Sequence, residues 1–97
     1  MTPPSYRRRP EVLWRRSLDA VVLLPPSAEE VVTVGGTGAD VWELLETWRT
    51  VDGLAQSLSQ RYDADEAIVH RDLEALLAHL VEHGALEIAE ESAEPGR

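Results

Sequence analysis

The sequence predicts an α+β domain in which a three-stranded antiparallel sheet at the N-terminal end is followed by three helices. The sheet is indicated by three short β-rich runs within residues 12–34, separated by turn-forming residues. The helices are indicated by apolar residues that recur at helical spacing from residue 37 to residue 83. A chain of 97 residues, of which 43% are hydrophobic, is long enough for one domain with one core.

The three expected strands are residues 12–17, 20–24 and 30–34. The second run, AVVLL, is continuously apolar with a strong β preference, and residues 25–28 (PPSA) end it. The third run, EVVTV, ends at the pair Gly35-Gly36. Connections this short favour a meander, so the sheet should be antiparallel.

Three helices are expected to follow. Thr37 and Asp40 resemble a helix start, because a side-chain oxygen caps free amides and an acid suits the first turn. A second helix begins near Thr50. Leu54, Leu58 and Tyr62 lie on one of its faces.

Either Asp63 or Asp65 is expected to cap the third helix, which carries the clearest amphipathic pattern of the chain. Its apolar stripe consists of Ile68, Val69, Leu73, Leu76, Leu77, Leu80 and Val81. Gly84 supplies a left-handed C-cap, and residues 85–88 form a short closing strand or pack on the body. Three helices with a strand-like end suggest a winged helix-turn-helix body.

The ends of the chain differ from its middle in composition. Residues 1–11 are expected to form a flexible arm, because Pro3, Pro4 and Pro10 interrupt regular structure and the arginines between them repel one another. Residues 89–97 are expected to form a disordered acidic tail. The folded domain should therefore span residues 12–88.

Charge and cysteine content exclude several classes of protein. The net charge is −9, from nine arginines and eighteen acids without any lysine, so specific DNA binding is disfavoured. The absence of cysteine removes disulfides, thiolate zinc sites and cysteine nucleophiles. The longest apolar stretch, residues 20–26, is too short to span a membrane, so a cytoplasmic protein is expected.

The sequence offers no convincing catalytic or cofactor site. His79 and His83 are one helical turn apart, but Glu82 stands in the wrong place for a metalloprotease motif and no third ligand is evident. Residues 35–38 (GGTG) precede a helix without the lysine of a phosphate-binding loop. We expect no metal, no cofactor and no enzymatic activity.

Three blocks carry a resemblance to a known family. They are the strand pair of residues 20–34, GGTGADVWELLE at residues 35–46, and RTVDGLAQSLSQRYD at residues 49–63. The last is followed by a helix with Asp72-Leu73 and a closing Gly84-Ala85-Leu86, displaced by one residue from the usual Gly-Leu. In order and spacing the chain resembles the PqqD-like family of peptide-binding modules, which are recognition elements for ribosomally synthesised and post-translationally modified peptides (RiPPs).

The resemblance implies a non-catalytic module that binds the leader region of a precursor peptide. The implied partners are that leader and a RiPP-modifying enzyme or leader peptidase. In the family the third strand receives the peptide by strand addition, and the third helix forms the other wall of the groove. The residues implied here are Glu30, Val31, Val32, Thr33, Val34, Val69, Arg71, Asp72, Leu73 and Leu76.

Alternation places Val32 and Val34 on one face of the third strand and Val31 and Thr33 on the other. A proline at Val32 is expected to remove an edge N–H and weaken peptide binding. The leucines of the third helix also suit a simple core, and Trp42 is expected as a core anchor.

Other functions stay open from the residues alone. The helical half would also suit a winged-helix DNA-binding regulator, although Arg71 is the only arginine of the third helix. The chain would equally suit a structural partner subunit of a larger enzyme. The peptide product stays open between pyrroloquinoline quinone (PQQ), a lasso peptide and another RiPP.

Overall fold

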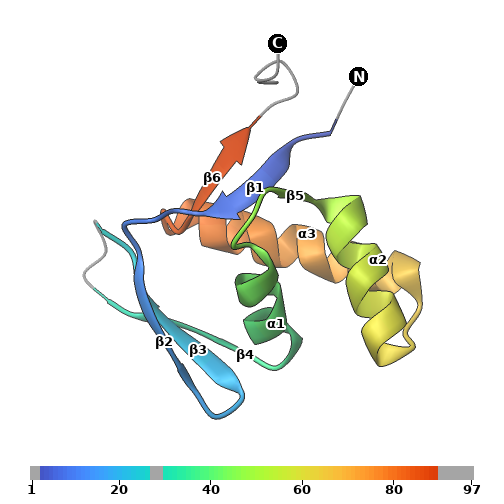
Figure 1. Cartoon of the computed structure of the whole chain (residues 1–97), viewed down its shortest axis with the longest axis horizontal. Coiled ribbons are helices and arrows are strands. Elements are labelled where there is room, and N and C mark those ends of the chain that lie inside the picture. The colour runs from blue at the N-terminus through green and yellow to red at the C-terminus, as the bar shows by residue number, and fades with distance from the viewer. Residues whose placement is uncertain (1–2, 27–29, 90–97) are drawn as a thin grey trace.

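A computed structural model describes residues 3–26 and 30–89, which form six strands and three helices (Figure 1). In chain order the elements are β1 (Ser5–Arg8), β2 (Leu13–Ser17), β3 (Ala20–Leu24), β4 (Val32–Gly35), α1 (Thr37–Leu44), β5 (Arg49–Thr50), α2 (Val51–Tyr62), α3 (Glu66–Glu82) and β6 (Leu86–Ala89). The α+β class and the three helices are confirmed.

The predicted antiparallel meander is confirmed as a sheet in the order β2-β3-β4. Its inner face is apolar: Val21, Leu23 and Val34 are buried, whereas Thr33 on the alternate face is exposed. The third strand begins at Val32 rather than at Glu30. The β3–β4 ladder ends at the pair Leu23↔Val32, and Pro25 follows β3 closely, so the two preceding residues have no ladder to join.

Local signals set most helix ends. The Thr50 hydroxyl accepts a hydrogen bond from the Gly53 amide at 3.0 Å, and the Asp65 carboxylate accepts one from the Ala67 amide at 2.9 Å. Gly84 has the expected left-handed conformation, with φ of 75°. The expected cap at Thr37 is wrong, because Gly36 is the N-cap residue and its φ of 60° turns the chain into α1 without a side-chain cap.

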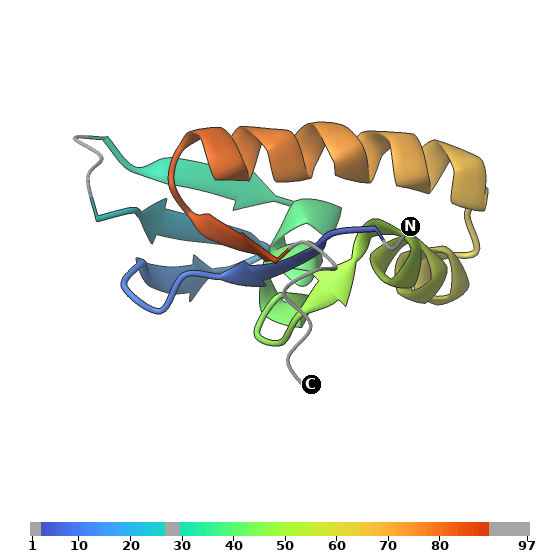
Figure 2. The same cartoon turned by 90° about the horizontal axis from the view of Figure 1, so that it is seen from above.

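The core lies where the meander and the three helices meet. Trp42 is fully buried at its centre, as expected, and its ring meets the edge of Trp14 with centroids 6.1 Å apart. Leu73, Leu77 and Leu80 bring α3 into the same core. Figure 2 shows α3 running along one side of the molecule, where it can present a second face to solvent.

The N-terminal segment corrects the expectation of a flexible arm over residues 1–11. Residues 5–8 form β1, the central strand of a second sheet with the order β5-β1-β6. Beyond the strand, the Arg9 amide donates to the Ala85 carbonyl at 3.0 Å, and Val12 is buried. Residues 86–89 form β6, which confirms a closing strand and places Ala89 in the sheet; the rest of the expected tail lies outside the described residues.

The arginines of this N-terminal segment have partners in the folded domain, so their positive charges do not prevent the segment from packing on it. The Arg7 guanidinium lies 2.8 Å from the Glu87 carboxylate and 4.6 Å from the ring centre of Trp48. The Arg8 guanidinium lies 4.9 Å from the ring centre of Trp14. Cation–π and ionic contacts therefore replace the mutual repulsion that the composition indicated.

Candidate functional site

The outer edge of β4 is open in the part of the chain that the structure describes. β4 pairs with β3 alone, and the direction of its hydrogen-bonding groups follows from the register. Ser17 and Ala20 close the β2–β3 hairpin, so Val21 and Leu23 direct their backbone groups to β4. The bond from the Gly36 amide to the Asp19 carbonyl, 3.1 Å long, agrees with this alternation. Thr33 therefore directs its N–H and C=O away from the sheet.

The same register corrects the expectation for a proline at Val32. Val32 and Val34 stand opposite Leu23 and Val21, and the alternation turns their N–H groups toward β3. A proline there would break the sheet itself rather than the open edge. Thr33 is the position that tests the edge.

A cavity of about 260 Å³ opens among the three helices. It is lined by Thr37, Gly38, Val41, Leu58, Tyr62, Ala64, Ile68, Val69, Asp72, Leu73 and Leu76. Four of the five expected residues of α3 meet here. Leu73 is buried and forms the floor, Val69 and Leu76 are half-buried, and Asp72 is exposed. The exposed Arg71 lies outside this lining.

Gly38 connects this cavity with β4. A side-chain carbon at Gly38 would lie 2.3 Å from a methyl group of Val34 and 3.7 Å from a methyl group of Leu76. The missing side chain therefore lets the end of β4, the start of α1 and the middle of α3 approach closely. The expected strand residues do not line the cavity. Val34 is buried and Val32 is half-buried, whereas Glu30, Val31 and Thr33 are exposed.

Two large side chains of the cavity were expected only as members of packing stripes. Ile68 is 50% exposed and Tyr62 is 47% exposed, at the ends of α3 and α2 that lie next to each other in the sequence. The helical periodicity included both residues, but periodicity does not tell a core position from one on the rim. The feature of the sequence that could have identified them is the short connection between the two helices. The last turn of α2 and the first turn of α3 are exposed on either side of this connection.

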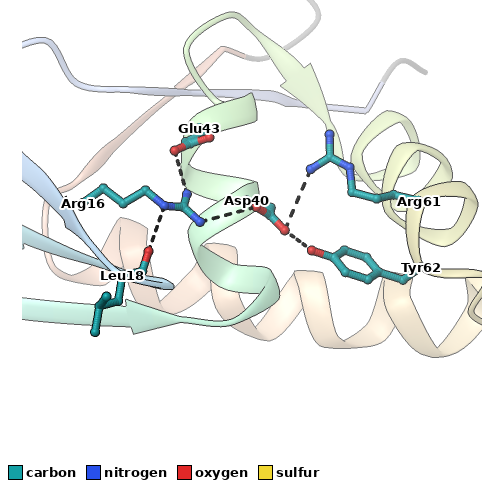
Figure 3. A network of polar contacts seen from close by, with 6 residues as sticks. All are labelled: Arg16, Leu18, Asp40, Glu43, Arg61 and Tyr62. Carbon is teal, nitrogen blue, oxygen red and sulfur yellow. Dashed lines mark hydrogen bonds and ion pairs between the residues drawn. The ribbon is translucent and has the colours of Figure 1, made fainter.

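A polar network holds Tyr62 in place (Figure 3). Its hydroxyl donates to the Asp40 carboxylate of α1, which also lies 3.8 Å from Arg61 and 4.0 Å from Arg16. Arg16 of β2 makes a further ion pair with Glu43 at 2.6 Å. The network joins β2, α1 and α2 and fixes one end of the cavity wall.

The Tyr62–Asp40 bond should make stability depend on alkaline pH. The hydrogen bond to the Asp40 carboxylate, aided by desolvation and by the charge of that carboxylate, raises the pKa of Tyr62 above its ordinary value of 10.0. A raised pKa means that the stabilisation is complete below pH 10 and is lost as the pH rises through the folded-state pKa. We expect Tyr62→Phe to be less stable than the parent in urea unfolding at pH 8, with the gap closing at more alkaline pH. A gap independent of pH would contradict this.

Among residues 3–26 and 30–89 no group of three or more His, Asp or Glu side chains is arranged to hold a metal ion. The rings of His79 and His83 instead meet edge to face with their centres 4.4 Å apart. No helix in these ranges is both long enough and apolar enough to cross a membrane.

Comparison with known proteins agrees with this architecture. The model of the family described as coenzyme PQQ synthesis protein D (PqqD) matches residues 20–86. This chain belongs to the PqqD family. The matched region runs from the start of β3 to the start of β6 and so contains β4, α3 and the cavity, whereas β1 and β2 precede it.

Two solved structures resemble this PqqD-family chain closely. One is TbiB1 in complex with the TbiA(β) leader peptide, with a TM-score of 0.75 and 26% identity over 84% of this chain and 94% of that one. The other is the solution NMR structure of the PqqD truncation of Methylobacterium extorquens PqqCD, a functional and stand-alone RiPP recognition element. Its TM-score is 0.71, with 33% identity over 86% of this chain and 88% of that one. No curated protein matches the chain significantly in sequence.

Proposed function

We propose that this PqqD-family chain binds the leader of a ribosomally made precursor peptide as an added strand on β4. The bound leader is then presented to a separate modifying enzyme or leader peptidase. The observation that carries the proposal is the open edge of β4, a strand whose end approaches, at Gly38, the apolar cavity walled by α3. The resemblance to TbiB1, whose structure contains a leader peptide, supports the same assignment.

Strand addition divides the task between backbone and side chains. The N–H and C=O of Thr33 would pair with the leader backbone whatever its sequence, which gives affinity. Alternate side chains of the added strand would face α3, where Val69, Leu73 and Leu76 offer apolar contact. Asp72 at the rim would favour a hydrogen-bond donor or a basic group on the leader.

The remaining expected residues have flanking roles in this proposal. Glu30, Val31 and Val32 would guide the leader along the start of the edge, and Arg71 would meet residues that pass beyond the groove. The function is recognition without catalysis. The proposed function implies a cytoplasmic location, because the precursor is made on ribosomes.

A titration with the leader peptide encoded nearest this gene tests the proposal. In backbone-amide NMR, we expect binding with a dissociation constant on the order of micromolar or tighter. The shifts should concentrate on Thr33 and on Val69 and Leu76 of α3. A leader with the same composition in scrambled order serves as the control. Equal binding of both peptides, or shifts elsewhere on the domain, would contradict the proposed groove.

A further inference from the structure

A second cleft, of about 470 Å³, lies on another side of α3 and is formed with β1, β6 and the start of α2. From α3 it takes His70, Glu74, Ala78 and Val81. At ~100° per residue, this stripe is about 160° around the helix from the α3 residues that line the cavity beside β4. The helix α3 therefore separates the cleft from the cavity, so a ligand in the cavity would leave the cleft accessible.

The floor of this cleft is apolar. Tyr6 of β1 and Ile88 of β6 are cross-strand neighbours on the sheet face that lines it, and Val51 and Val81 complete the floor from the two helices. Ile88 is 44% exposed, so an apolar group seated here would remove further surface from water. The next pair along the strands, Arg7 and Glu87, alternates to the opposite face of the sheet.

The rim of the cleft is acidic. The side chains of Asp52 and Glu74 are 76% and 62% exposed, so their carboxylates are accessible from solvent. His70 lies between them, with ring nitrogens 2.9 Å from Asp52 and 3.8 Å from Glu74. The lining includes neither arginine nor lysine in the described part of the chain. A cationic ligand would therefore find two carboxylates around an apolar floor.

We propose that this cleft docks a basic segment with flanking apolar residues, supplied by the enzyme that acts on the bound leader. The partner's task rests on the proposed function, whereas the cleft and its charge do not. Carboxylates at the rim select for Arg or Lys, and the floor accepts the apolar neighbours. The chain's own residues 90–97, with three Glu and one Arg, have the wrong sign to compete. Enzyme and leader then occupy opposite sides of α3 at the same time.

Two alanines of α3 provide a matched test. Ala78 lines the cleft, whereas Ala75 is also exposed but lines neither hollow. Ala78→Arg places a bulky cation in the cleft and Ala75→Arg places the same group outside it. Both substitutions keep a residue that favours helices. The first probe is an acetylated, amidated octapeptide of alternating Leu and Arg, with a Leu/Glu octapeptide as its control.

We expect the Leu/Arg peptide to shift the amide signals of Asp52, Glu74 and Ile88. Ala78→Arg should weaken its binding at least ~tenfold, and Ala75→Arg should leave it unchanged. The modifying enzyme or peptidase encoded beside this gene should show the same difference between the two variants. Equal binding of either ligand by both folded variants would overturn the proposal. Equal binding of the Leu/Glu and Leu/Arg peptides would also overturn it. So would tighter binding of the Leu/Arg peptide by a chain that ends at Ala89, because residues 90–97 would then compete for the cleft.

A leader titration of the same variants separates the two proposals. Ala78→Arg should bind the leader as the parent does, because Ala78 lies on the side of α3 away from the leader groove. If the leader fails to bind the parent protein while the Leu/Arg peptide still occupies the cleft, the proposed function falls and the cleft stands. If the leader binds and neither basic probe nor enzyme uses the cleft, only the docking proposal falls.

Discussion

Replacing Thr33 with proline is expected to weaken leader binding at least ~tenfold while the domain stays folded. The register turns the Thr33 N–H away from β3, so the substitution costs no hydrogen bond within the sheet. It removes a donor that an added strand needs and places ring carbons against the incoming backbone. Loss of one such bond, with its partner left unpaired, costs about 1–3 kcal/mol, and 1.4 kcal/mol corresponds to tenfold in affinity. Calorimetric titration with the leader measures the change.

Two further substitutions control this experiment. Thr33→Ala keeps the N–H and should bind the leader nearly as well as the parent. Val32→Pro should instead lower the free energy of unfolding, because that N–H faces β3. If folded Thr33→Pro binds the leader with parental affinity, the peptide does not add to β4.

Removing residues 1–8 is expected to lower the free energy of unfolding by about 3–6 kcal/mol, a large share of the stability of a small domain. The truncation removes the central strand of the sheet β5-β1-β6, so both remaining strands lose their partner. It also removes Tyr6, which packs against the core, and the Arg8 amide bond to the Leu45 carbonyl, 2.9 Å long. Each lost hydrogen bond contributes about 1 kcal/mol. Urea unfolding of the truncated and full chains measures the difference.

Arg7→Gln is the mild counterpart of this truncation. It removes the ion pair with Glu87 and the cation over Trp48 but keeps the strand. Because the paired side chains are each about a third exposed, the loss should stay below about 1 kcal/mol. A truncated chain as stable as the full one would mean that β1 adds nothing to the fold.

Elements that depend on local signals were predictable from the sequence. β3 is an uninterrupted apolar run and α3 a long amphipathic stripe, and short side chains at Thr50 and Asp65 mark two helix starts. β1 was not predictable in this way. Its sequence, SYRR, lacks apolar alternation, and its partners in β6 lie some eighty positions away.

The candidate site likewise contains residues that helical spacing predicts and residues that only the fold identifies. The stripe with Val69, Leu73 and Leu76 was evident from helical spacing. The spacing does not show that Leu73 is buried and Leu76 only half-buried, because burial depends on the neighbouring elements of the fold. Whether Val32 or Thr33 offers its backbone to a ligand depends on the β3–β4 register. The second cleft depends on β1 and so has no local signal.

Pairing between the two ends of the domain has a consequence for kinetics. The partners Arg7 and Glu87 are 80 positions apart, so closing the β1–β6 ladder requires a long loop to be ordered first. If these contacts form after the rate-limiting step, their loss should speed unfolding and change the refolding rate little, which the two limbs of a chevron plot would show. The strand would then act as a latch: it sets how long the folded domain persists more than how fast it forms.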